Sequence, residues 1–419
     1  MTQQLFTKNF IFLILGQVAS LFGNFILKLA LSMYVLEMTG QAAVFAGILS
    51  VAIIPTILLS PLGGILADRA NKRNIMVTLD MLTGISVLCA AVLLSERNAI
   101  AVITILLVLL SVLGAFETPT VQACIPFMLQ GDNITKGNAV VNQAASISYF
   151  LAPALGGVLY AAFGLKPVMY VSICLFFVTA FLECFIKLSY VRYGAHANVF
   201  SIIKQDFSES MQFLFREEIG ILTMLLFVAL SRFFVMGITV VGLPFIVRTV
   251  LGLSARYYGT AESAMAVATI FGSIMAGVFI GKLKICRLPL LLSLLGVFLL
   301  PAGIAFWLPI GAFGKYCIIV AAFCCMQAAI SVFSIFGVSL IQRKTPNQLI
   351  GKVMAYTSVV TLCVQPLGQM AYGFLFDRFC NTIYLVLIPT GVIVGIIGLS
   401  ALGFFAELER DIVLDRQQN

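Results

Sequence analysis

Three ionisable residues lie deep inside long apolar runs of this chain, far from either end: Lys28, Glu117 and Arg232. A charged side chain at the bilayer centre costs about 2.5–3.5 kcal/mol on insertion scales, so such residues mark functional sites. A buried carboxyl group can take up and release a proton, whereas a buried cation can bind an anionic group of a substrate. At about 1.5 Å per residue, each lies roughly 12–20 Å from the nearest helix end. We therefore expect a polar site near the midplane, with Glu117 as the proton carrier.

Other polar side chains accompany these three at helical spacing. Gln17, Ser20, Asn24 and Lys28 share one face of the first apolar run, and a later run carries Gln327, Ser331 and Ser334. Such stripes are unfavourable against lipid, so they should face water, substrate or another helix. We predict a substrate cavity lined by Gln17, Asn24, Lys28, Glu117, Arg232, Gln327 and Ser331. The alternative is that they hold helices together, for example through a Lys28–Glu117 ion pair, and the two roles can coexist.

The composition indicates which elements must position these residues. Hydrophobic residues make up 61% and charged residues 10%, against roughly 45–50% and about 25% in soluble domains. An apolar run of about 20 residues crosses a bilayer as a helix. Twelve such runs occur: 9–36, 42–67, 74–95, 99–127, 137–163, 167–190, 219–247, 256–281, 288–308, 316–342, 349–376 and 382–406. The chain is therefore predicted to be an all-α membrane protein with twelve transmembrane helices.

The basic residues are distributed unevenly between the two sides of the predicted membrane. The formal net charge is +8, from 25 Lys and Arg against 17 Asp and Glu. With the N-terminus inside, most basic residues fall in cytoplasmic segments. The outside loops hold Arg97, Lys166, Arg248, Arg256, Lys315 and Arg378. This asymmetry follows the positive-inside rule and predicts cytoplasmic N and C termini in a multi-pass protein of the cell membrane. It also argues against nucleic acid as a partner.

Two short sequence motifs each occur twice in the chain, and the same number of residues separates the two copies of each motif. This repeat predicts two homologous halves. Gly64 and Arg69 map onto Gly277 and Lys282, and Pro153 maps onto Pro366. Internal repeats of this kind are common in transporters. We expect a six-helix half over 1–190, a cytoplasmic linker with an amphipathic helix over 191–218, a second six-helix half over 219–406 and a tail over 407–419.

The loop between the second and third runs carries a dense charge motif, Gly64-x-x-x-Asp68-Arg69-x-x-x-Arg73. Asp68 can meet the positive end of the helix that starts near Thr345. We predict a latch at the cytoplasmic face that includes Gly64, Asp68, Arg69 and Arg73 and is braced by Asp80. The alternative is that the basic residues only set the orientation in the membrane.

This motif resembles the signature loop of the major facilitator superfamily. The flanking residues are similar to the bacterial macrolide-efflux and multidrug exporter branch: Gly16-Gln17, Thr39-Gly40, Asp80, Thr118-Pro119 and Ser146-Ile147-Ser148-Tyr149. The resemblance implies a monomer that works by alternating access, with the first, fourth, seventh and tenth helices around the cavity. The stretch Pro153-Ala154-Leu155-Gly156-Gly157 resembles an exporter motif, although Ser148 and Ala152 replace expected glycines. Pro153, Gly156 and Gly157 are predicted to serve helix packing or antiport.

The remaining chemistry points away from enzymes. The chain has one histidine, His196, and ten cysteines without a Cys-x-x-Cys pair, which argues against a metal centre. It has no phosphate-binding Gly-x-x-x-x-Gly-Lys-Ser/Thr loop, so an ion gradient should supply the energy, without a cofactor. We predict a secondary transporter that exports hydrophobic or amphipathic compounds by proton antiport. The two buried cations, Lys28 and Arg232, outnumber the one buried acid, Glu117, so the predicted cavity is formally positive. An exporter or flippase of an anionic amphiphile, such as a siderophore or lysolipid, therefore remains an alternative. A nutrient importer of the same fold and a non-transporting receptor also remain open.

Overall fold

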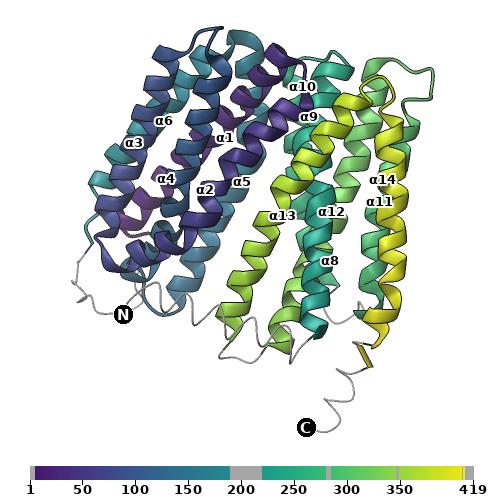
Figure 1. The fold of residues 1–419 in the computed structure, drawn as a ribbon. Helices are drawn as coiled ribbons and strands as arrows, with labels where there is room; N and C mark the ends of the chain where they lie inside the picture. Colours follow the sequence, from purple (N-terminus) through teal and green to yellow (C-terminus); the bar gives the residue numbers. More distant parts are fainter. Residues whose placement is uncertain (1–4, 189–218, 280–284, 346–348, 408, 411–419) are drawn as a thin grey trace. The chain divides into compact units, whose positions relative to one another are not determined.

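The computed structural model describes residues 5–188, 219–279, 285–345, 349–407 and 409–410. In this part of the chain, 12 helices are long and apolar enough to cross a membrane, which confirms the predicted number (Figure 1). The predicted amphipathic helix of 191–218 lies outside the described residues. So do the side chains of Asp68 and Arg69 and the end of the tail.

Helices α1 to α6 form the first part of the chain: α1 (Lys8–Thr39), α2 (Ala42–Arg69), α3 (Lys72–Leu93), α4 (Ala99–Met128), α5 (Asp132–Phe163) and α6 (Leu165–Cys184). Local signals set the ends of α1. The Thr7 hydroxyl accepts a hydrogen bond from the Phe10 amide at 3.3 Å, as an N-cap residue does. Gly40 ends the helix with φ 62°, a left-handed conformation that glycine adopts without strain.

Helix α1 lies at the centre of this group. It packs against α5 and α6, while α3 packs on α4 and α6 and α2 packs on α4. Near the start of α1, Phe10 and Leu13 are fully buried against Met76 of α3 and Cys124 of α4. Residues of α1, α3, α4 and α6 are therefore held close together.

The later helices are α8 (Ile219–Met236), α10 (Ala255–Val278), α11 (Leu288–Ile304), α12 (Ala312–Lys344), α13 (Ile350–Arg378) and α14 (Tyr384–Ser400). The span that begins with α8 continues through the π-helix η2 (Gly237–Gly242), α9 (Leu243–Phe245) and the π-helix η3 (Ile246–Val250). A short 3₁₀ turn, η4 (Ile285–Arg287), precedes α11. Gly237 and Gly242 in η2 lie directly against Tyr372 and Phe376 of α13, where a larger side chain would not fit.

The contacts divide the chain into two compact units. The first comprises residues 1–195, 247–249 and 253–263, and the second comprises 196–246, 250–252 and 264–419. The predicted halves and these units therefore differ in one respect. Part of η3 and the first turns of α10 belong to the first unit, although they follow the predicted linker in the sequence.

The glycines of the predicted packing motif lie at close helix contacts in the first unit. A Cβ on Gly156 would be 3.2 Å from the Cα of Ile26 in α1. A Cβ on Gly157 would be 2.8 Å from the Ala255 carbonyl oxygen at the start of α10. Small residues permit this approach. The geometry thus supports the packing role of the motif and leaves its role in antiport a prediction.

Replacing Gly259 by alanine should destabilise the protein. A Cβ on Gly259 would overlap the backbone carbonyl of Pro153, which cannot move as a flexible side chain would. We expect a loss of about 1–3 kcal/mol, typical of overpacking, measured as the free energy of unfolding of the purified protein in detergent. The matched control is Gly47→Ala in α2, where a Cβ would meet nothing within 4 Å. Equal stability of the two variants would contradict this reading of the interface.

Candidate functional site

A polar cluster lies inside the first unit, at the contact of α1, α3 and α4. The Ser20 hydroxyl is 3.0 Å from Asp80 Oδ1 and 3.2 Å from Glu117 Oε1. The Gln17 side chain also hydrogen-bonds Glu117, and Lys28 is close enough to attract its charge. The structure therefore brings together Gln17, Lys28 and Glu117, three of the predicted cavity residues, and adds to them Ser20 and Asp80, of which Asp80 was predicted for the latch.

A second carboxyl group, that of Glu183 in α6, extends this cluster. Glu183 is fully buried and Asp80 is 2% exposed, and their carboxyl groups lie within hydrogen-bonding reach of each other. Gly16 of α1 makes room for Glu183, since a Cβ at Gly16 would be 3.5 Å from Glu183 Cγ. No role was predicted for Glu183 because it stands near the end of its apolar run.

The two ends of the cluster differ in exposure. Gln17 and Ser20 are buried, Glu117 is half-buried, and Lys28 is exposed. Lys28 and Glu117 attract each other without a direct ion pair in the described structure. The cluster is thus accessible beside Lys28 and closed around Glu183, which suits a site that exchanges a proton or ligand at one end.

The other predicted cavity residues have no described hydrogen bond to the polar cluster. Asn24 Oδ1 and Gln327 Oε1 are buried with no hydrogen-bond partner, so each has an unused acceptor. Ser331 donates to the Thr269 carbonyl at 3.1 Å and lies 2.9 Å from Ser273, which uses its hydroxyl between α12 and α10. Arg232 is exposed on α8 in the second unit.

The predicted latch is described only in part. The Arg73 guanidinium donates to the Cys184 carbonyl oxygen at 2.6 Å, so it ties α3 to the end of α6. Gly64 has open space around it. Asp80, predicted to brace the latch, hydrogen-bonds Ser20 inside the polar cluster. The latch itself remains a prediction.

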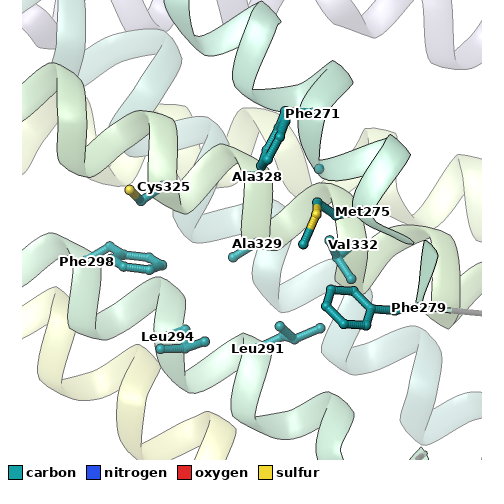
Figure 2. A pocket seen from close by; sticks show the side chains of 11 residues that line it. Phe271, Met275, Phe279, Leu291, Leu294, Phe298, Cys325, Ala328, Ala329 and Val332 are labelled. Atoms are coloured by element: carbon teal, nitrogen blue, oxygen red, sulfur yellow. The ribbon is translucent and has the colours of Figure 1, made fainter. Parts of the chain in front are cut away.

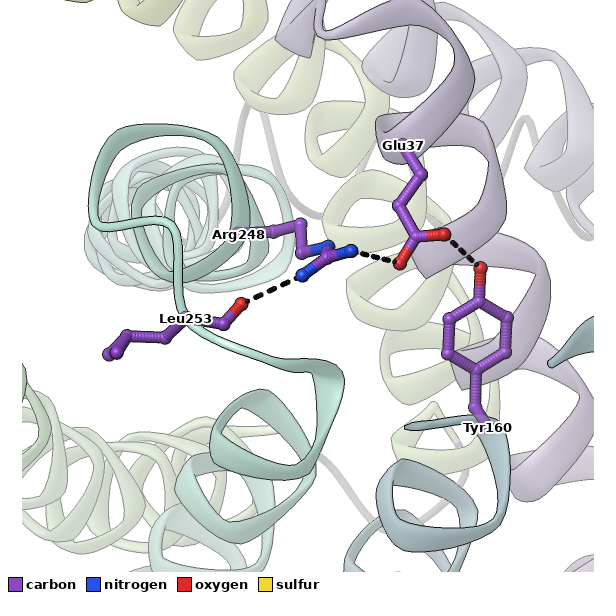
Figure 3. Close-up of polar contacts among 4 residues, drawn as sticks. All are labelled: Glu37, Tyr160, Arg248 and Leu253. Carbon is purple, nitrogen blue, oxygen red and sulfur yellow. Dashed lines mark hydrogen bonds and ion pairs between the residues drawn. The ribbon is translucent and has the colours of Figure 1, made fainter. Parts of the chain in front are cut away.

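A charged network that the sequence did not reveal joins α1, α5 and η3 (Figure 3). Arg248 and Glu37 form an ion pair at 2.7 Å. The Tyr160 hydroxyl donates to the other Glu37 oxygen at 2.7 Å, and Arg248 also donates to the Leu253 carbonyl at 3.2 Å. All four residues belong to the first unit. The sequence shows an acid, Glu37, and a base, Arg248, at the ends of two distant spans. It does not show that these two residues lie close together in the fold.

The second unit contains an apolar cavity of about 410 Å³ between α10, α11 and α12. Figure 2 shows Phe271, Met275 and Phe279 on one side of it and Leu291, Leu294 and Phe298 on another, with Cys325, Ala328, Ala329 and Val332 between them. Its volume is within the range of small-molecule sites, which are mostly apolar. The cavity can take a lipophilic group but offers no charged contact.

Within the described residues, no group of three or more His, Cys, Asp and Glu side chains is arranged to hold a metal ion.

Known proteins resemble this chain, some along most of its length and others along part of it. Macrolide efflux protein A of Streptococcus pyogenes is 24% identical over 371 residues, which cover 87% of this chain and 88% of that protein. The Staphyloferrin A transporter of Staphylococcus aureus is 28% identical over 189 residues, covering 44% of this chain and 45% of that one. Among solved structures, a variant of the nucleoside transporter NupG has a TM-score of 0.73 at 14% identity, covering 94% of this chain and 99% of that chain.

At this low sequence identity, the similarity to solved structures shows only the fold. The family to which the chain belongs is shown by a sequence model of that family. The model described as Major Facilitator Superfamily matches residues 13–367. The predicted resemblance, the twelve-helix fold class and the multi-pass membrane location are thereby confirmed, and the chain is a transporter and not an enzyme. The protein belongs to the Major Facilitator Superfamily.

Proposed function

We propose that this protein exports hydrophobic or amphipathic small molecules by proton antiport with alternating access. The observation that carries the proposal is the cluster of Ser20, Asp80 and Glu117 with Lys28 beside it. Carboxyl groups inside transmembrane helices are retained where protons or ions are handled. Proton uptake by Glu117 would cancel its charge beside Lys28 and so favour a different arrangement of the helices.

The substrate class follows from the apolar cavity and the relatives. A cavity of about 410 Å³ without charged lining residues suits a lipophilic molecule or the lipophilic part of one. A macrolide efflux protein is similar over 87% of the chain, which supports macrolide-like and multidrug-like compounds. Lys28 and Arg232, together with the similarity of part of the chain to a staphyloferrin A transporter, favour an anionic amphiphile as the second candidate.

The experiment is transport into inverted membrane vesicles, which take up the compounds that cells export. Erythromycin, staphyloferrin A and a lysophospholipid are each offered with an imposed proton gradient, with and without a protonophore. We expect uptake of at least one compound, abolished by the protonophore and absent from vesicles without the protein. Uptake by right-side-out vesicles instead would make the protein an importer. No gradient-dependent movement in either orientation would contradict transport by proton antiport.

A further inference from the structure

The polar atoms around Glu183 are not fully satisfied. Both oxygens of Glu183 and Oδ2 of Asp80 are buried, and none of the three has a hydrogen-bond donor. Buried polar atoms are nearly always hydrogen-bonded, and leaving one unsatisfied destabilises the fold. Two ionised carboxylates can only accept hydrogen bonds, so they cannot satisfy each other. A proton on one of them would let it donate to the other and would satisfy two of these atoms.

Among the described side chains, no cation takes the place of that proton. Lys72, on α3, lies with its ammonium 4.3 Å from the centre of the Phe127 ring, and Arg73 donates to the Cys184 carbonyl. Within the described part of the chain, neither is hydrogen-bonded to Glu183. The other described titratable groups that face the pair are Glu117 and the Cys124 thiol of α4, and Lys28 lies beyond Glu117.

Ser20 links this carboxyl pair to Glu117. Its hydroxyl has one hydrogen but lies within hydrogen-bonding distance of Asp80 and Glu117. It can therefore donate to only one of the two carboxyl groups at a time. When Glu117 carries a proton it can donate to the Ser20 oxygen, and Ser20 then donates to Asp80. When Asp80 carries the proton, both hydrogen bonds reverse.

Glu117, Asp80 and Glu183 lie at successively smaller distances from the cytoplasmic ends of their helices. Glu117 lies about 16 Å along α4 from the end of that helix at Met128, and Asp80 about 12 Å along α3 from its start at Lys72. Glu183 is one residue from the end of α6 at Cys184. By the positive-inside rule these three helix ends are cytoplasmic. The groups thus lead from the membrane interior toward the cytoplasm.

We propose that Asp80 and Glu183 form a proton-binding site, with one proton held between their carboxyl groups, and that Ser20 connects this site to Glu117. In the transfer step, which fills an empty site, Glu117 gives its proton to the Ser20 oxygen while the Ser20 hydroxyl proton moves to Asp80, which then shares it with the Glu183 carboxylate. Glu117 becomes a carboxylate and Asp80 a carboxylic acid, so the total charge does not change. The shared proton is independent of transport, whereas the connecting role of Ser20 rests on the proposed proton antiport.

Infrared difference spectroscopy of the purified protein in lipid tests the shared proton. A protonated carboxyl group has its own C=O stretching band, which disappears when the group ionises. We expect a band that is lost in both Glu183→Gln and Asp80→Asn and is kept in Glu262→Gln. Glu262 is a matched control because it is a membrane carboxyl group bonded elsewhere, to the Tyr258 hydroxyl. Survival of the band in both single variants, or its absence at every pH in the wild type, would overturn the site.

Two substitutions at Ser20 provide an independent test of the site if Glu183→Gln or Asp80→Asn fails to fold. Ser20→Ala removes the donor to Asp80 and should shift the band, whereas Ser20→Thr keeps the hydroxyl and should not. In proteoliposomes with erythromycin as the probe, Ser20→Ala should lose proton-driven transport and Ser20→Thr should retain it. A shifted band with unchanged transport would reject the connection and keep the site. A wild type that shows the band but no proton-driven transport would reject the proposed function instead.

Discussion

Glu117→Gln is expected to abolish proton-driven export. Glutamine has nearly the same shape and can still accept a hydrogen bond from Ser20, but it cannot bind and release a proton. Transport driven by a pH gradient in proteoliposomes should therefore fall to the level of liposomes without protein. Exchange of labelled for unlabelled substrate, which moves no net proton, should persist. This difference separates loss of coupling from loss of binding.

The control for Glu117→Gln is Glu96→Gln. Glu96 is an exposed acid between α3 and α4 and lies outside the polar cluster. It should leave both gradient-driven transport and exchange unchanged. If Glu117→Gln retains full gradient-driven export, Glu117 is not the proton carrier, and the pair of Asp80 and Glu183 becomes the next candidate.

The sequence was sufficient for the fold because membrane spans depend on local composition. An apolar run of about 20 residues must form a helix to satisfy its backbone groups in lipid. The span boundaries were less predictable. The third helix begins at Lys72, ahead of its predicted start near Asn74, because Asn71 caps it with a side-chain hydrogen bond to the Asn74 amide.

The candidate site was predictable only where its residues share a helix. Gln17, Ser20 and Lys28 are related by helical spacing, so their common face follows from the sequence. Their meeting with Glu117 and Asp80 depends on how α1, α3 and α4 pack, which no local pattern specifies. Glu183 was missed for a related reason, since it reaches Asp80 through the space left beside Gly16.

The π-helical segments of the seventh span also could not be predicted from the sequence. Apolar residues fill η2 and η3 as they would an ordinary helix, and the changed backbone register becomes visible only in three dimensions. Such segments often occur at functional sites. Here η3 carries Arg248, the partner of Glu37.

Reversing one charge of the Glu37–Arg248 pair should slow export, and reversing both should restore it. The two residues come from the two predicted halves of the sequence, and the proposed alternating access requires these halves to move against each other. The pair is about one-third exposed on each side, so losing it should be worth about 1 kcal/mol, or about fivefold in a two-state population. Each single reversal, Glu37→Arg or Arg248→Glu, also places two like charges together and should have a larger effect than loss of the pair alone. The measurement is the initial export rate of Glu37→Arg, Arg248→Glu and the double variant, with Tyr160→Phe as a variant that keeps the ion pair. If the double variant is as slow as either single variant, the residues act separately and the pair does not stabilise a transport state.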